Sequence, residues 1–283
     1  MRRDFKVLTK KKGMTLTFIG LGLYDHKDVT LRGKEAIQKA DLLFLEQYTS
    51  LLAESRQQLE KVFRKKIMPA DRELVEQRAE EILTPALTKE VAFLVVGDPM
   101  AATTHADLYL RARQKGIEVK IIHNASIMNA IGAVGLELYK YGKTTSIVFP
   151  ELDWTVETHY NTIKQNQEHG LHTLCLLDIK VKEARKDDLR TNSAKGKART
   201  EPRFMTVNDA LRNLLTLEKE RKENVITDNH LVVGVARLGH PDQIIKSGTI
   251  KELLSFDFGK PLHTLIIPGT LHFIEEEMLK LWK

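Results

Sequence analysis

The chain has 283 residues, of which 42% are hydrophobic and 29% are charged, a composition typical of a folded protein with one large or two modest domains. Its net charge of +6 is concentrated in two segments: residues 1–13 hold six basic residues and one acidic residue, and residues 180–203 hold nine basic and four acidic residues, so the rest of the chain carries −4. The rest of the chain is therefore slightly acidic and lacks an aromatic base-stacking platform, which argues against an RNA-binding module. No apolar run reaches the roughly 18 residues of a membrane span.

The first predicted strand, residues 16–19, runs into Gly20-Leu21-Gly22, and a helical pattern follows over residues 30–40. Glycines at this spacing let the backbone turn sharply and approach a ligand closely. A dinucleotide fingerprint also requires a third glycine and an acidic residue about 20 residues further on. Asp25 occupies the third glycine position, which outweighs the presence of Glu46 near the acidic position. The pattern therefore argues against a nicotinamide-binding dehydrogenase.

Further strands are predicted over residues 42–45 and 91–96. The second of these meets Gly97-Asp98-Pro99, after which Thr103 and Thr104 open a helical pattern. Asp98 therefore follows the carboxyl end of a strand, where open α/β sheets bind their ligands. A purely structural turn is the alternative interpretation.

A fourth strand is predicted over residues 119–122, followed by a helix that begins at Asn124 or Ser126 and continues to Leu138. Gly132 and Gly135 would let this helix pack closely against a neighbour. A capped core helix accounts for most of these residues. Yet three strand ends, each followed by a loop and a helix, would form a pocket if they met at one sheet edge.

A second α/β half follows a junction at residues 142–145. Strands are predicted over residues 146–149, 172–177, 231–236 and 263–267, with an additional strand over residues 243–249. Helices are predicted over residues 156–169, 207–220 and 271–281. The only cysteine, Cys175, cannot form an internal disulfide and is expected to be a buried, inert thiol. Nothing in the sequence resembles a set of metal ligands.

Long motifs carry a resemblance to a known family. GLGLYD, VVGDPMAATTHADL, HNASIMNAIG, HTLCLLDIK and PLHTLIIPG occur in the order seen in the diphthine synthase family of the tetrapyrrole-methylase superfamily, and the resemblance runs from about residue 14 to the C-terminus. The spacer between HTLCLLDIK and RFMTVNDAL is similar to the longer eukaryotic form. The resemblance implies two α/β domains, residues 14–142 and 143–283, with a cofactor cleft between them. Residues 1–13 would be a flexible basic extension, and residues 180–203 a basic insert that could steer a macromolecular substrate.

The resemblance also implies that S-adenosylmethionine binds in this cleft in a folded conformation. Carried over position by position, its contacts are Leu23, Asp98, Ala101, Ser126, Ile127, Leu177, Leu238 and His263. Side-chain chemistry matters least at Ala101 and Leu238, which vary within the family. Taken singly, most of these residues could instead be core residues, a helix cap or a strand-end histidine.

The implied reaction is repeated methylation of the 3-amino-3-carboxypropyl arm on a modified histidine of elongation factor 2, with a further methyl ester on the arm's carboxylate. The attacking amine must be neutral, and His26, Asp98, His105 and His263 are conceivable proton acceptors, although solvent could also remove the proton. A tetrapyrrole C-methyltransferase is the alternative. The resemblance further implies a cytoplasmic homodimer that contacts neither nucleic acid nor membrane.

Overall fold

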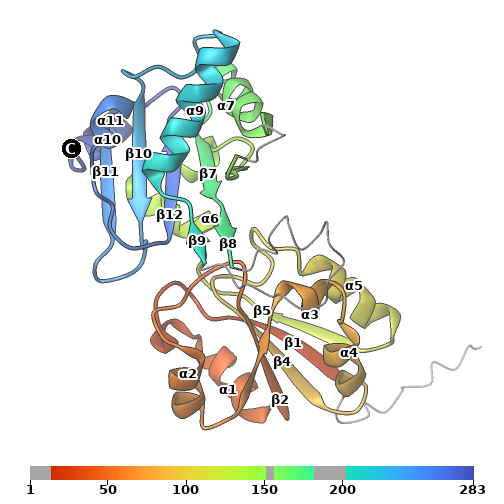
Figure 1. The fold of residues 1–283 in the computed structure, drawn as a ribbon. Helices are drawn as coiled ribbons and strands as arrows, with labels where there is room; N and C mark the ends of the chain where they lie inside the picture. Colours follow the sequence, from red (N-terminus) through yellow and green to blue (C-terminus); the bar gives the residue numbers. More distant parts are fainter. Residues whose placement is uncertain (1–13, 151–155, 182–201) are drawn as a thin grey trace, which may run out of the picture. The chain divides into compact units, whose positions relative to one another are not determined.

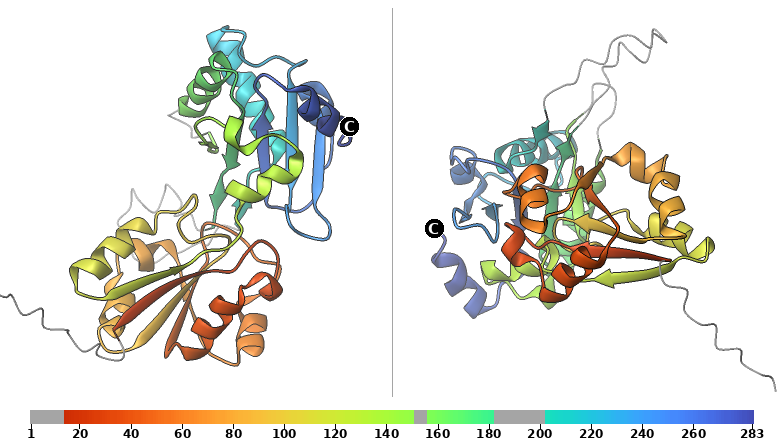
Figure 2. Two further views of the ribbon diagram at one scale, coloured as in Figure 1. Left: turned by 180° about the vertical axis from the view of Figure 1, so that it is seen from behind. Right: turned by 90° about the horizontal axis from the view of Figure 1, so that it is seen from below.

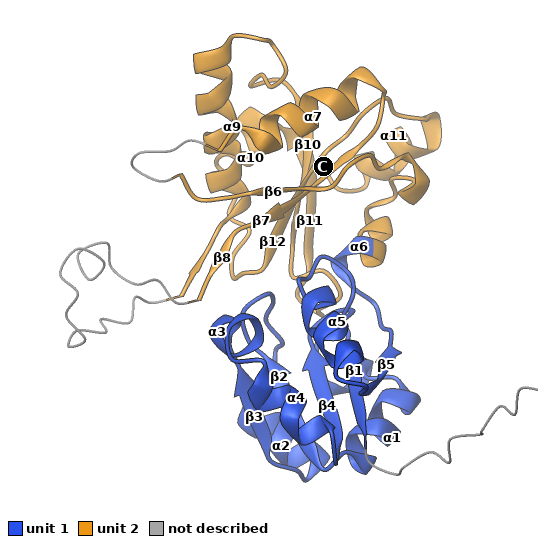
Figure 3. Ribbon diagram, turned by 90° about the vertical axis from the view of Figure 1, so that its right-hand side faces the viewer, with its two compact units in different colours: residues 1–128 blue, residues 129–283 orange. Residues whose placement is uncertain are grey.

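The computed structural model describes residues 14–150, 156–181 and 202–283 (Figure 1). The predicted extension at residues 1–13 and nearly all of the predicted insert at residues 180–203 lie outside the described residues. The chain divides into two compact units, Met1–Met128 and Asn129–Lys283 (Figure 3). The boundary predicted after residue 142 therefore lies within the second unit.

The first unit is built on a fully parallel sheet, and the α/β fold expected for this half of the chain is confirmed. Its five strands lie in the order β3-β2-β4-β1-β5. The strands are β1 (Thr15–Gly20), β2 (Leu42–Glu46), β3 (Ile67–Ala70), β4 (Glu90–Val95) and β5 (Glu118–Ile122). Because all five are parallel, their carboxyl ends meet at one edge of the sheet.

Helices cover both faces of this sheet, as Figures 1 and 2 show. Alternate side chains of β1 enter two separate cores. Leu16 and Phe18 pack with α3 (Arg72–Glu76), α4 (Glu80–Ala86) and α5 (Ala106–Gln114). Ile19 packs on the other face with α1 (Leu31–Lys39) and α2 (Arg56–Phe63). Burial on both faces explains why the strands read as continuous apolar runs.

The helix predicted from residue 126 to residue 138 is wrong in its extent. The structure has a single turn, α6 (Ile127–Ala130), followed by two 3₁₀ segments, η2 (Ile131–Val134) and η3 (Leu138–Lys140). Gly135 ends η2 with a φ of 94°, and a Cβ there would lie 2.5 Å from Cβ of Met278. The close packing predicted for this glycine is thus confirmed, but the left-handed backbone that it permits stops the helix.

The second unit contains a mixed sheet in the order β11-β10-β12-β7-β6, of which only the β6–β7 pair is parallel. Its strands are β6 (Thr145–Ile147), β7 (Thr173–Leu177), β10 (Leu231–Ala236), β11 (Ile244–Thr249) and β12 (His263–Ile267). The additional strand predicted over residues 243–249 is therefore confirmed as β11. A two-stranded ribbon of β8 (Ile179–Lys180) and β9 (Arg203–Phe204) was not predicted.

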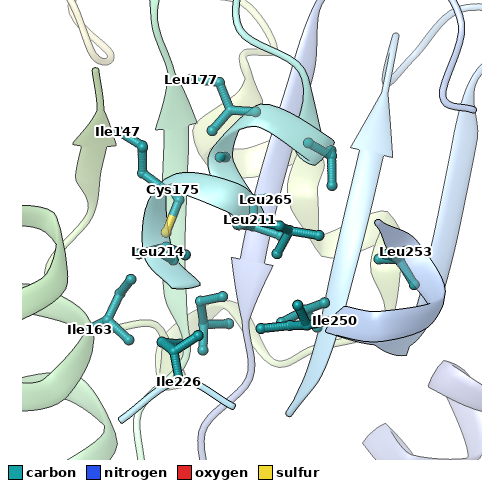
Figure 4. Close-up of a cluster of buried hydrophobic side chains, with 14 of the residues drawn as sticks. Ile147, Ile163, Cys175, Leu177, Leu211, Leu214, Ile226, Ile250, Leu253 and Leu265 are labelled. Carbon is teal, nitrogen blue, oxygen red and sulfur yellow. The ribbon is translucent and has the colours of Figure 1, made fainter. Parts of the chain in front are cut away.

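The core of the second unit lies between this sheet and its helices, α7 (Thr158–Glu168), α9 (Val207–Arg221) and α10 (Ile250–Leu253) (Figure 4). Cys175 lies fully buried within this core. Burial raises the pKa of its thiol well above the ordinary value. The expectation of a buried thiol is confirmed, and the raised pKa explains why it would be inert, because the thiolate is the reactive species.

A buried ionic cluster ties the last helix, α11 (Phe273–Lys280), to the rest of the second unit. The Glu275 carboxylate is fully buried and accepts hydrogen bonds from Nε2 of His172 at 2.9 Å and from the backbone N–H of Glu137 at 2.9 Å. Its other oxygen accepts from Nζ of Lys140 at 2.5 Å and from the backbone N–H of His272 at 2.8 Å. Four donors thus surround one buried carboxylate.

Candidate functional site

Two glycine loops meet at the carboxyl edge of the first unit's sheet. Gly22 follows β1 and Gly97 follows β4, and their backbones exchange two hydrogen bonds, with N···O distances of 3.3 Å and 2.7 Å. Both residues have positive φ, 83° at Gly22 and 79° at Gly97. Residues with a Cβ rarely adopt this conformation, which explains why glycine occupies both positions.

Leu23 is held by its backbone in the loop after β1. The Asp28 carboxylate accepts hydrogen bonds from the N–H groups of Leu23 and Tyr24, at 3.0 Å and 2.7 Å. Further along the same loop, Glu54 accepts from the backbone N–H of His26 at 2.8 Å and contacts Nδ1 of its ring at 2.7 Å. The chain that carries Leu23 is therefore fixed by two carboxylates from outside the predicted motif.

Asp98 joins the loop after β4 to the loop after β5. Its Oδ1 accepts from the backbone N–H of Met100 at 2.9 Å. Its Oδ2 accepts from the backbone N–H of Asn124 at 3.0 Å and from Nδ1 of His123 at 2.8 Å. Burial alone would raise the pKa of Asp98, but these hydrogen bonds outweigh it and lower the pKa below the ordinary value. The carboxylate therefore stays charged at neutral pH.

Asn124 connects three loops of this edge, a role that the sequence did not suggest beyond helix capping. Its Nδ2 donates to the carbonyl oxygens of Gly20 at 3.0 Å and Asp28 at 2.9 Å. A Cβ at Gly20 would lie 2.8 Å from Cβ of Asn124, so the glycine allows this close approach. An amide two residues after a predicted strand was the signal available in the sequence.

The segment from Pro99 to His105 forms a compact loop, so α5 begins at Ala106 and not at the predicted Thr103. Oγ1 of Thr103 donates to the Pro99 carbonyl at 2.8 Å, and Nδ1 of His105 lies 3.0 Å from the same oxygen. Ala101 lies within this loop, where its N–H donates to the Asp98 carbonyl. His105 is fully buried, and burial lowers its pKa. This placement favours a structural role for His105 over proton acceptance from a substrate.

Ser126 and Ile127 start α6, directly after the Asp98-bound loop. Ser126 is buried, and its Oγ accepts from the backbone N–H of Met128 at 3.3 Å, as a helix-capping residue does. The convergence of three strand ends expected from the pattern is therefore confirmed. Loops after β1, β4 and β5 bring the first five predicted contacts to one edge: Leu23, Asp98, Ala101, Ser126 and Ile127.

The other three predicted contacts gather at one end of the sheet in the second unit. His263 opens β12 and pairs with Ala236, the last residue of β10, so Leu238 follows closely beside it. β7 pairs with the other side of β12, where Leu176 lies opposite Thr264, and this pairing places Leu177 next to the start of β12. Residues far apart in the sequence are thus brought together within this unit.

Both ring nitrogens of His263 are occupied by the protein. Nδ1 accepts from the backbone N–H of Val207 at 3.3 Å, and Nε2 lies 3.0 Å from the Lys260 carbonyl, to which it donates. The Lys260 carbonyl also accepts from the guanidinium of Arg237, which further donates to the Phe258 carbonyl at 2.9 Å. Burial lowers the pKa of His263. A role as proton acceptor is therefore disfavoured, and contact to a ligand would come from its backbone.

Two classes of site are not found in the part of the chain that the structure describes. No group of three or more His, Cys, Asp or Glu side chains there is placed to hold a metal ion. Within the same residues, no helix is both long and apolar enough to span a bilayer.

Comparison with known proteins adds a family context to this geometry. The family model of tetrapyrrole (corrin/porphyrin) methylases matches residues 15–254. A diphthine methyl ester synthase from Dictyostelium discoideum is 52% identical over 273 residues, which cover 95% of this chain and 98% of that protein. A diphthine synthase from Methanocaldococcus jannaschii is 47% identical over 266 residues, covering 94% and 97% respectively. A crystal structure of a diphthine synthase superposes with a TM-score of 0.81 at 34% identity and covers 95% of each chain.

Proposed function

Since this chain belongs to the tetrapyrrole (corrin/porphyrin) methylase family, and within it to the diphthine synthases, we propose that it methylates the modified histidine of elongation factor 2 with S-adenosylmethionine. The chain is a methyltransferase of diphthamide biosynthesis. Its substrate is the 3-amino-3-carboxypropyl arm, and its products are the trimethylammonium form and the methyl ester of the arm's carboxylate. The names of the relatives support both outcomes, since they include diphthine synthase and diphthine methyl ester synthase.

The convergence of three loops at the carboxyl edge of the first sheet is the observation that carries this proposal. The charged carboxylate of Asp98 fits a cofactor with ammonium and hydroxyl groups, and the bare backbone of Gly22 and Gly97 fits close approach. Bound S-adenosylmethionine supplies an electrophilic sulfonium methyl group. The residues that would hold it are Leu23, Asp98, Ala101, Ser126 and Ile127 in the first unit and Leu177, Leu238 and His263 in the second.

Catalysis of this kind depends mainly on placing a nucleophile in line with the methyl group. Positioning of this kind can supply roughly 7–11 kcal/mol toward the barrier. The hydrogen bonds that fix Leu23 through Asp28, and Asp98 through Met100 and Asn124, hold the loops in one geometry before any ligand binds. This preorganisation is what the protein itself contributes.

Mass spectrometry tests the proposed reaction. Elongation factor 2 that carries the unmethylated arm is incubated with the enzyme and S-adenosylmethionine, and the same factor without the arm is the control. Methyl increments on the first sample alone are the expected result. Calorimetry with S-adenosylhomocysteine shows whether the enzyme sample binds the cofactor product. If it does and the mass of elongation factor 2 is unchanged, the proposed substrate is wrong. Methylation of a tetrapyrrole in its place would favour the tetrapyrrole C-methyltransferase.

The assembly state and the compartment are part of the same proposal. The family resemblance supports a homodimer in the cytoplasm, where elongation factor 2 works. Sedimentation equilibrium of the purified protein tests the first point, and a mass of one chain at micromolar concentration would contradict it. The distribution of the tagged protein between cell fractions tests the second.

A further inference from the structure

His123, which is not among the predicted site residues, forms a carboxylate–histidine pair with Asp98. Its ring follows β5 and places Nδ1 2.8 Å from Oδ2 of Asp98. The two side chains differ in exposure: 69% of the His123 side chain is accessible, against 11% for Asp98. The pair therefore has a buried acid and an outward-facing ring.

The hydrogen bond fixes which ring nitrogen is basic. An ionised carboxylate can only accept a hydrogen bond, so Nδ1 of His123 must carry the hydrogen. In the neutral ring, Nε2 then holds the lone pair, and it has no hydrogen-bond partner within the described residues. Enzymes that activate nucleophiles use this arrangement, in which a buried carboxylate sets the orientation and tautomer of a histidine base.

Other histidines of the chain lack this combination. His105 is buried, and both nitrogens of His263 are occupied. His26 also pairs with a carboxylate, Glu54 at 2.7 Å, but only 31% of its side chain is accessible. His123 differs from His26 in one further respect, because its partner Asp98 is itself one of the proposed cofactor contacts.

We propose that Nε2 of His123 accepts the proton from the ammonium group of the substrate arm, with Asp98 as the orienting carboxylate. This inference rests on the proposed function. An N–H bond of the ammonium breaks as an Nε2–H bond forms, and the freed nitrogen lone pair then forms the N–CH₃ bond. The S–CH₃ bond of the sulfonium breaks with its electron pair passing to sulfur, giving a neutral thioether. His123 returns its proton to water before the next methyl is added.

A chemical asymmetry follows from this assignment. Each N-methylation that starts from an ammonium group requires the loss of one proton before attack. Formation of the methyl ester requires none, because the carboxylate is already ionised at neutral pH and attacks as it stands. Loss of His123 should therefore slow methylation of the nitrogen and spare methylation of the oxygen. A structural defect at the same position would slow both.

The test compares His123→Ala with His169→Ala, a control that removes an exposed ring at the end of α7, where Nδ1 lies 2.7 Å from the backbone carbonyl of Gln165. Two substrates are used: elongation factor 2 with the unmethylated arm, and the same factor with the trimethylammonium arm. For His123→Ala we expect N-methylation to fall by about 10²–10⁴-fold, the usual contribution of a general base. Ester formation should stay within about threefold of wild type, and added imidazole should partly restore N-methylation. His169→Ala should change neither rate by more than about threefold.

Two measurements do not depend on catalysis. S-adenosylhomocysteine should bind His123→Ala within about threefold of wild type, because Met100 and Asn124 still donate to Asp98. In the wild-type protein, ¹⁵N NMR of the His123 ring should show hydrogen on Nδ1 and a lone pair on Nε2. The opposite tautomer would overturn the inference even if the variant failed to fold.

The remaining outcomes separate the two proposals. An active wild type together with unchanged N-methylation in His123→Ala, or an equal loss of both reactions, overturns the inference alone. A wild type that leaves the mass of elongation factor 2 unchanged overturns the proposed function and this inference with it.

Discussion

Replacing Glu275 by glutamine should destabilise the second unit by about 3 kcal/mol at neutral pH. Burial would by itself raise the pKa of Glu275, but the N–H groups of His272 and Glu137, the Lys140 ammonium and the His172 ring lower it from 4.5 to about 2. Each unit by which the pKa is lower in the folded state corresponds to about 1.4 kcal/mol of stabilisation of the charged form by folding. The resulting value of about 3 kcal/mol agrees with the roughly 3–5 kcal/mol typical of breaking a buried ion pair.

The pH dependence of this effect has a definite sign. A carboxyl group whose pKa is lower in the folded than in the unfolded state stabilises the fold fully above the unfolded value, here near 4.5. The stabilisation is lost as the pH falls from 4.5 towards 2. Because glutamine does not titrate, the difference in unfolding free energy between wild type and Glu275→Gln should shrink over that interval.

Urea unfolding followed by tryptophan fluorescence measures this difference. Trp282 lies in the second unit, where its Nε1 donates to the Val134 carbonyl at 2.8 Å, and a Trp154→Phe background removes the other tryptophan. Glu276→Gln is the matched control, since Glu276 is the exposed neighbour on the same helix. Surface substitutions typically change the free energy of unfolding by no more than about 0.5 kcal/mol. A Glu275→Gln protein whose unfolding free energy lies within that range of wild type at pH 7 would refute the reasoning. So would a difference in unfolding free energy that persists at pH 2.

Three further predictions concern the site and the core. Asp98→Ala should weaken S-adenosylhomocysteine binding at least about tenfold in calorimetry, because it removes a carboxylate that accepts three hydrogen bonds. The control, Asp107→Ala on the exposed face of α5, should leave the affinity unchanged. Equal affinities of the two variants would remove Asp98 from the site. Gly22→Ala should lower the melting temperature more than Gly116→Ala does. Both glycines have positive φ, but only at Gly22 would the added Cβ lie 2.4 Å from a neighbouring side chain. Similar shifts in melting temperature would contradict this steric argument. Cys175 should resist a thiol reagent in the native protein and react in urea, and rapid native labelling would show that its burial is wrong.

Features that local pattern determines were predictable. The strands of both sheets that carry the candidate site were expected from their apolar runs, and they lie close to where they were expected. Short elements such as β3 and the β8–β9 ribbon were missed, because two to four residues carry too little periodicity to be read. The backbone of Gly135, which ends η2, lies close to Met278 far along the chain, so no local window contains this contact.

The candidate site divides in the same way. Asp98 and the glycine loops were indicated by their place at strand ends, whereas the remaining contacts came from the family resemblance. The supporting side chains were not anticipated: Asp28, Glu54 and Arg237 act through backbone groups that are distant or that belong to turns formed only in the folded chain. His123 was read as part of a motif and not as a chemical group, because its pairing with Asp98 spans 25 residues.

The amide of Asn124 has a consequence for re-engineering this enzyme toward other acceptors. Because that single group donates to two backbone oxygens, those of Gly20 and Asp28, which precede it by 104 and 96 residues, its loss would remove the donor of both oxygens at once. A combinatorial library that varies it would consist mostly of non-functional clones. Libraries that select for new acceptor specificities should therefore leave this amide unchanged.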